Sequence, residues 1–250
     1  MRKLSLSLLA LVALLSFSIP STSFAQGTNQ ISENTAIIPA AKGEWWMKRH
    51  ESFLNRAKEG GIDLLFLGDS ITDFWRNRGS NVWNEFYAPR HAANFGISGD
   101  RTQNVLWRID HGELDGIHPK VVVLMIGTNN TGKEHDGVTP RNSTPEVIAG
   151  IQAVVRDVRA KLPDSKILLL AMFPRGTLEN PQRAQVALIN TVIAKLGDEP
   201  NVTFLDIGYK FLESDGTLPR NIMPDLLHPN ERGYRIWAEA MEPTLAQMFK

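Results

Sequence analysis

Cysteine is absent from the 250 residues of the chain. The chain therefore has no disulfide, no thiolate ligand for zinc, no cysteine nucleophile and no attachment point for a lipoprotein anchor. Its stability must come from the packing of a core. Apolar residues make up 42% of the chain and charged residues 22%, which is the balance of a globular protein.

An excess of charge of either sign is also lacking. The chain has 27 Lys and Arg residues and 27 Asp and Glu residues, so its formal net charge is +0. The basic residues are scattered along the sequence and form no cluster. These features exclude nucleic acid and anionic membrane surfaces as expected partners.

Long apolar runs are confined to the N-terminus. Arg2 and Lys3 precede an uncharged apolar stretch over residues 4–19, and small residues follow up to Ala25. This pattern predicts a secretory signal peptide over residues 1–25, cleaved after Ala25. The stretch is shorter than the ~20 residues that span a bilayer. We therefore expect an exported protein, periplasmic or extracellular, with no membrane span in its mature form. The polar residues 26–43 predict a flexible leader.

From residue 44 onward, short apolar runs alternate with amphipathic segments. The uninterrupted, β-branched run over residues 121–126 is typical of a parallel strand that is covered on both faces. The alternation predicts a single α/β domain over residues 44–250, with a three-layer, doubly wound parallel sheet. Strands are expected over 62–67, 92–95, 121–126, 166–173 and 202–206, and helices over 45–58, 102–109, 144–162, 181–196 and 230–249. In such sheets the ligand crevice lies beyond the carboxyl ends of the strands.

A serine stands directly after the first expected strand, in the sequence Gly68-Asp69-Ser70. Backbone amides at the start of the following helix would suit a nucleophile that forms an oxyanion. Taken alone, the tripeptide fits an N-cap serine in a tight turn equally well.

Possible oxyanion donors follow the next two strands. Gly99 lies in the loop after the second strand, where the absence of a side chain lets its backbone N–H approach a ligand. Asn129 follows the third strand, and its side-chain amide offers uncharged N–H donors. With the N–H of Ser70 these groups would form an oxyanion hole.

A histidine and a carboxylate precede the last helix. Asp225 and His228 are three residues apart on one loop, so they can contact each other directly. His228 could take the proton of Ser70, and Asp225 could fix the tautomer of His228 and stabilise its imidazolium form. Together, the four blocks supply the groups that two-step acyl transfer needs.

Competing assignments are weaker. Ser98 is a rival nucleophile and Asp206 a rival triad acid, for which a structural role is expected. Residues 127–133 resemble a phosphate-binding loop, but Glu134 stands where a Ser or Thr must bind magnesium. The other five histidines show no spacing of metal ligands and are interpreted as surface or capping residues. No metal and no cofactor is expected.

The four blocks that contain Ser70, Gly99, Asn129 and the Asp225–His228 pair resemble those of the SGNH (GDSL) hydrolases. The longer stretch over residues 94–130, which includes Gln103-Asn104-Val105-Leu106-Trp107-Arg108 and Gly112-Glu113-Leu114, is similar to the catalytic subunits of type Ib platelet-activating-factor acetylhydrolase. The similarity covers roughly residues 45–248.

This resemblance implies a flavodoxin-like sheet, no metal, and hydrolysis of short-chain esters, acetyl esters in particular. It also implies that Ile71 and Leu227 crowd the acyl pocket, and it allows a homodimer. The chain departs from the pattern at Ser98, where the subfamily has a second glycine. The export signal is foreign to the intracellular enzymes, so their lipid substrate and dimer partners do not transfer directly.

Three functions follow as hypotheses. The first is an exported serine esterase that acts on acetylated carbohydrates or lipids. The second is a thioesterase or lysophospholipase that uses the same site. The third is a carbohydrate-binding module on a catalytically dead esterase fold, against which the intact Ser70, Asp225 and His228 argue. The loop over residues 131–142 borders the expected site and is a candidate for setting specificity.

Overall fold

A computed structural model describes residues 33–250, so the predicted signal peptide and residues 26–32 lie outside the described part of the chain. Within this part, five strands form one sheet in the order β2-β1-β3-β4-β5, and every adjacent pair is parallel. The strands are β1 (Leu64–Gly68), β2 (Ala92–Gly96), β3 (Val121–Met125), β4 (Lys166–Leu170) and β5 (Val202–Leu205). The α/β prediction is confirmed.

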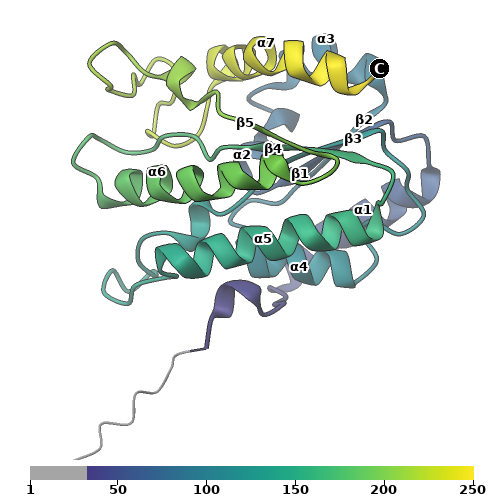
Figure 1. Ribbon diagram of the computed structural model, residues 1–250, viewed down its shortest axis with the longest axis horizontal. Coiled ribbons are helices and arrows are strands. Elements are labelled where there is room, and N and C mark those ends of the chain that lie inside the picture. Colours follow the sequence, from purple (N-terminus) through teal and green to yellow (C-terminus); the bar gives the residue numbers. More distant parts are fainter. Residues whose placement is uncertain (1–32) are drawn as a thin grey trace, which may run out of the picture. The chain divides into compact units, whose positions relative to one another are not determined.

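Helices cover both faces of the sheet (Figure 1). One face packs against α1 (Glu44–Glu59), α4 (Thr102–Asp110), α5 (Thr144–Lys161) and α6 (Pro181–Ile193). The other face packs against α2 (Ser70–Asp73), α3 (Ser80–Phe86) and α7 (Glu231–Met248). Short 3-10 helices complete the chain: η1 (Thr35–Ile37), η2 (Phe74–Arg76), η3 (Ala88–Arg90), η4 (Thr128–Asn130), η5 (Ala194–Asp198) and η6 (Gly208–Phe211).

The strands alternate their side chains between two apolar layers. In β1, Leu65 and Leu67 enter the core on the α5 side, whereas Leu64 and Phe66 enter the core on the α7 side. The five residues of β1 and the five of β3 are all buried. A strand that is covered on both faces needs apolar residues at every position, which explains the uninterrupted apolar runs in the sequence.

The segment before α1 differs from the prediction. A flexible leader was expected up to residue 43, but residues 34–43 pack against α4. Ala36 is fully buried and its carbonyl accepts a hydrogen bond from Thr102 Oγ1 at 2.7 Å. The Ala40 carbonyl accepts a hydrogen bond from Asn104 Nδ2 at 2.8 Å. In both bonds, residues 34–43 contribute a backbone carbonyl, which any residue offers, so the contacts do not show in the apolar pattern.

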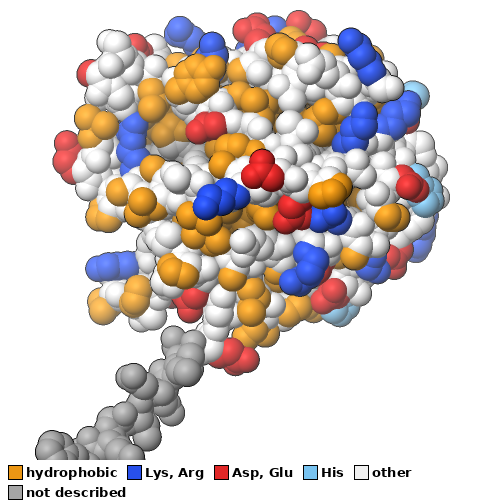
Figure 2. Space-filling view, in the orientation of Figure 1, with side chains coloured by type: hydrophobic (Ala, Val, Ile, Leu, Met, Phe, Trp, Pro, Cys, Tyr) orange, Lys and Arg blue, Asp and Glu red, His pale blue; other side chains and the backbone are white. Residues whose placement is uncertain are grey.

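Charges of both signs are interspersed over the face of the molecule that Figure 2 shows, as the scattered sequence positions predict. No helix within residues 33–250 is long and apolar enough to cross a membrane.

Candidate active site

The candidate nucleophile lies at the carboxyl end of β1. Asp69 caps the short helix α2, because its Oδ1 accepts a hydrogen bond from the Ile71 N–H at 3.0 Å. This turn requires glycine at Gly68, where an added Cβ would lie 2.3 Å from Thr72 Oγ1 and 2.5 Å from the Met125 carbonyl oxygen. Ser70 begins α2 and is 6% exposed. Its hydroxyl is therefore held at the edge of the sheet.

The structure brings Ser70, His228 and Asp225 together. Ser70 Oγ lies 2.8 Å from His228 Nε2, although 158 residues separate them in the sequence. His228 Nδ1 lies 2.7 Å from Asp225 Oδ2. The Ser–His distance is within the range of a nucleophile and its general base.

Asp225 holds the histidine loop by more than one bond. Its Oδ1 accepts hydrogen bonds from the His228 N–H at 2.7 Å and from the Leu227 N–H at 3.1 Å. Partial burial acts to raise the pKa of Asp225, but the hydrogen bonds from His228 outweigh it and hold the pKa below its usual value. The carboxylate is thus charged at neutral pH and fixes the ring by Nδ1.

The two candidate oxyanion donors also lie close together. Gly99 has a φ of 78°, a conformation that favours glycine. Asn129 lies on η4 after β3, and its Nδ2 donates to the carbonyl of Asp100 at 2.9 Å. Gly99 and Asn129 line the same pocket.

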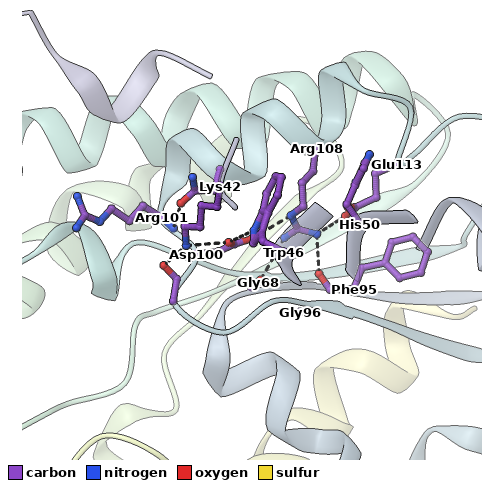
Figure 3. A network of polar contacts seen from close by, with 12 residues as sticks. Lys42, Trp46, His50, Gly68, Phe95, Gly96, Asp100, Arg101, Arg108 and Glu113 are labelled. Carbon is purple, nitrogen blue, oxygen red and sulfur yellow. Dashed lines mark hydrogen bonds and ion pairs between the residues drawn. The ribbon is translucent and has the colours of Figure 1, made fainter. Parts of the chain in front are cut away.

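A buried ionic network connects this loop to the end of β1 (Figure 3). Arg108 has no exposed surface, and its Nε lies 3.0 Å from Asp100 Oδ2. Arg108 also donates to the carbonyls of Phe95 at 2.9 Å and Gly68 at 3.3 Å, at the ends of β2 and β1. It pairs on its other side with Glu113. A single guanidinium thus joins the backbone before Ser70 to the loop that carries Gly99.

Further side chains complete the network. Asp100 Oδ1 accepts hydrogen bonds from Trp46 Nε1 at 2.6 Å and from Lys42 Nζ at 3.2 Å. The second oxygen of Glu113 lies 3.2 Å from His50 Nδ1. His50 is 2% exposed, so its interpretation as a surface or capping residue is wrong. Its ring packs against those of Trp46 and Trp107, at 6.1 Å and 5.2 Å between centroids, which accounts for its burial on an apolar helix face.

The predicted acyl-pocket residues are both near the site. Ile71 follows Ser70 and is 2% exposed, within the apolar cluster on the α7 side of the sheet. Leu227 precedes His228, is half-buried, and packs against the same cluster. Both side chains therefore belong to the apolar cluster on the α7 side of the sheet.

The rival residues are engaged elsewhere. Ser98 Oγ donates to Asp73 Oδ2 at 2.7 Å. Asp206 Oδ1 accepts a hydrogen bond from the Gly208 N–H at 2.7 Å, which is the expected structural role. Within residues 33–250, no group of three or more His, Asp or Glu side chains is arranged to hold a metal ion.

Asp69 gives a prediction for stability. Complete burial raises its pKa to about 7, and the nearby charge of Asp100 adds to this effect, against the hydrogen bond from Ile71. Unfolded Asp69 would lose its proton near pH 4, so the folded state binds more protons than the unfolded state up to about pH 7. Stability therefore falls as pH rises through this window.

Asp69→Asn keeps the oxygen that accepts from Ile71 and removes the titration. We expect the free energy of unfolding of the parent to fall by about 2 kcal/mol more than that of the variant between pH 5 and pH 7. Urea unfolding of both proteins at the two pH values measures this difference. Parallel pH profiles of the two proteins would contradict the assignment.

The network formed by Arg108, Asp100 and Trp46 was not predicted from the sequence. Arg108 and Glu113 were noted only as part of a family-like stretch. One signal was available: Arg108 lies on the same turn of its helix as the apolar residues Val105 and Ile109, which are buried. A charge on an apolar helix face requires a buried partner.

Comparisons with known proteins identify the family to which the chain belongs. Residues 66–236 match the profile of the GDSL-like lipase/acylhydrolase family. The chain is 36% identical over 223 residues to platelet-activating factor acetylhydrolase IB subunit alpha2 of Gallus gallus, covering 87% of this chain and 93% of the relative.

Solved structures share the fold. A GDSL-like lipase from Bacteroides thetaiotaomicron gives a TM-score of 0.62 at 17% identity, covering 79% of this chain and 97% of that chain. An acetylxylan esterase from Geobacillus stearothermophilus gives a TM-score of 0.59 at 23% identity, covering 76% and 94%. The resemblance drawn from the sequence motifs is confirmed. The chain belongs to the GDSL-like lipase/acylhydrolase family and is a carboxylic ester hydrolase.

Proposed function

We propose that this chain is a serine esterase that removes short acyl groups, acetyl groups in particular, from carbohydrate or lipid esters. The observation that carries the proposal is the chain of contacts from Ser70 Oγ to His228 Nε2 at 2.8 Å and from His228 Nδ1 to Asp225 Oδ2 at 2.7 Å. With Nδ1 protonated towards Asp225, Nε2 is free to accept the Ser70 proton.

The proposed reaction has two steps. Ser70 Oγ attacks the ester carbonyl as its proton passes to His228, and the carbonyl oxygen becomes an oxyanion held by the Ser70 and Gly99 N–H groups and the Asn129 amide. His228 then protonates the departing alkoxide, which leaves an acyl-serine. Water, deprotonated by His228, attacks this intermediate; the acyl–Oγ bond breaks, His228 returns the proton to Ser70 Oγ, and the carboxylic acid is released. Asp225 stabilises the imidazolium in both steps.

The names of the relatives support acetyl as the acyl group. One is a platelet-activating factor acetylhydrolase subunit and one structural neighbour is an acetylxylan esterase. The first suggests a lipid and the second a carbohydrate as the alcohol part. The thioesterase or lysophospholipase alternative needs room for a long acyl chain, and the bulky Ile71 and Leu227 expected at the acyl pocket argue against it.

Export also belongs to this proposal. The signal peptide predicted over residues 1–25 lies outside the described residues, and mass spectrometry of the N-terminus of the secreted or periplasmic protein would check cleavage after Ala25. A homodimer stays a prediction that light scattering of the purified chain would check.

The proposal is tested with the p-nitrophenyl esters of acetate, butyrate and octanoate and the purified mature chain. We expect kcat/KM to fall from acetate to octanoate, and Ser70→Ala to be inactive on all three. Best activity on octanoate would favour the thioesterase or lysophospholipase alternative. An inactive parent would favour the carbohydrate-binding module.

Leu227→Ala is expected to change the acyl preference. Removing the half-buried side chain leaves space beside His228, so the octanoate-to-acetate ratio of kcat/KM should rise about tenfold. Leu188→Ala is the matched control, because Leu188 lies on α6 and is 61% exposed. An unchanged ratio in Leu227→Ala would remove Leu227 from the acyl pocket.

A further inference from the structure

A cationic pocket adjoins the candidate oxyanion donors. It has a volume of about 470 Å³, and Gly99 and Asn129 form part of its lining. Lys42, Arg101 and Arg141 also line it, and no Asp or Glu side chain does. The volume is within the range of small-molecule sites. The pocket is therefore large enough for a sugar-sized group and presents positive charge to it.

The positive charge is only partly compensated. Arg101 and Arg141 share the carboxylate of Glu134, at 2.6 Å and 3.5 Å. Arg141 Nε is buried and makes no hydrogen bond within the described residues. Lys42 shares Asp100 with the buried Arg108.

The charged residues of the pocket, taken together with the ion-pair partners that they contact, carry a net positive charge. Its four cations are Lys42, Arg101, Arg108 and Arg141, and its three carboxylates are those of Asp100, Glu113 and Glu134. The side chains of Lys42, Arg101 and Arg141 are 32%, 22% and 17% exposed, so they are sheltered from full screening by water. Burial lowers the pKa of Arg141, and the neighbouring positive charge of Arg101 lowers it further.

The pocket is joined directly to the catalytic loops. Lys42 Nζ donates to the Gly99 carbonyl at 2.6 Å, and Arg141 Nη1 donates to the Asn129 carbonyl at 2.9 Å. Ile71 and Leu227, which would wall the acyl group, are not part of its lining. An ester whose carbonyl oxygen lies at Gly99 and Asn129 would thus direct its alcohol portion, not its acyl group, towards these cations.

We propose that this pocket binds an anionic group, a carboxylate or a phosphate, on the alcohol portion of the ester substrate. Arg101 already holds one carboxylate, that of Glu134, through both of its terminal nitrogens, and Figure 3 shows its side chain pointing away from the Arg108 network. Guanidinium groups favour carboxylate and phosphate by this paired geometry. The inference rests on the proposed esterase function and narrows it to acetyl esters of acidic sugars or related anionic alcohols.

Activity measurements on matched charged and neutral substrates test whether the pocket prefers an anionic alcohol portion. Acetylated galacturonic acid is compared with its neutral methyl ester, and acetylated galactose 6-phosphate with acetylated galactose. We expect kcat/KM to be at least about tenfold higher for the anionic member of one pair, and the preferred pair identifies carboxylate or phosphate. The preference should shrink as ionic strength rises from 0.02 to 0.3 M, because screening weakens charge attraction.

Arg101→Gln should reduce this anionic-to-neutral ratio to about threefold or less. The matched control is Arg235→Gln, which removes an exposed arginine paired with Glu85 on the α7 side of the sheet and should leave the ratio unchanged. Equal rates within both pairs for the parent would overturn the proposal. So would an equal loss on both members of a pair in Arg101→Gln, since that result marks a purely structural arginine.

Measurements of sugar binding test the anion-binding pocket independently of the proposed esterase function. Saturation-transfer NMR with free galacturonate against methyl galacturonate, and galactose 6-phosphate against galactose, uses no ester hydrolysis. Stronger binding of an anionic sugar to the parent than to Arg101→Gln supports the pocket, even if the parent hydrolyses no ester. Equal binding of charged and neutral sugars would reject the pocket while leaving an esterase function intact.

Discussion

Ser70→Ala is expected to lower kcat on p-nitrophenyl acetate by about 10⁴–10⁶-fold, because it removes the atom that forms the acyl-enzyme. Ser70 Oγ has His228 Nε2 as its neighbour at 2.8 Å, and Ser98 is occupied with Asp73. We therefore expect no other serine to replace it. Initial rates at saturating substrate measure the effect.

A double-variant comparison sharpens this prediction. His228→Ala should cost about as much as Ser70→Ala, and the double variant should be no worse than either, because the two residues act as a unit. Thermal unfolding of each variant serves as the control for folding. Additive losses in the double variant would show that the two side chains act independently, against the proposed mechanism.

Arg108→Met is expected to lower the free energy of unfolding by about 3–5 kcal/mol, because removing one partner leaves charged groups buried and unpaired. The carboxylates of Asp100 and Glu113 have no exposed surface, and both depend on Arg108. The pKa of Asp100 is already raised, mainly by burial, so its charge is costly even with the arginine present. Urea unfolding measures the loss.

The same variant should also slow the reaction where the protein stays folded. Arg108 holds the Gly68 carbonyl and Asp100, and the Asp100 carbonyl in turn accepts from Asn129, so the distance between nucleophile and oxyanion donors depends on this side chain. We expect kcat to fall about 10²-fold, the cost of a displacement of about 1 Å, with a smaller change in KM.

Arg159→Met is the matched control for Arg108→Met. Arg159 pairs with Glu199, and their side chains are 36% and 41% exposed. Such a pair contributes about 0–1 kcal/mol, so we expect little change in stability and none in kcat. If Arg108→Met behaved like this control, the network would have no positioning role.

Much of the fold could be predicted from local patterns. All five expected strands are present, with ends that differ by at most three residues from those predicted. The helix α3 was not predicted, because Gly79 and Asn81 near its start resemble a turn and only Val82 of its seven residues is fully buried. The sequence pattern does not reveal that residues 34–43 are ordered, because their backbone carbonyls accept the hydrogen bonds from side chains of α4 and any residue offers a carbonyl.

The sequence by itself determined the local features of the candidate site. Asp225 and His228 are three residues apart, so one turn of chain suffices to join them, and Gly68 and Asp69 shape the turn that presents Ser70. Short-range geometry of this kind depends only on residues that are close in the sequence, so it can be predicted from their identity and spacing. The alternation of apolar runs likewise determined the α/β class.

Only the tertiary structure decided which distant residues meet. The 158-residue separation of Ser70 and His228 is closed because α7, which follows the His228 loop, packs back over the face of the sheet that carries α2, where Tyr234 Oη donates to the Ile71 carbonyl at 2.7 Å. The burial of Arg108 and the gathering of Lys42, Arg101 and Arg141 around one pocket depend on the same packing. Charged side chains have no periodicity that reveals their partners, since each partner is selected by the positions of whole helices and strands.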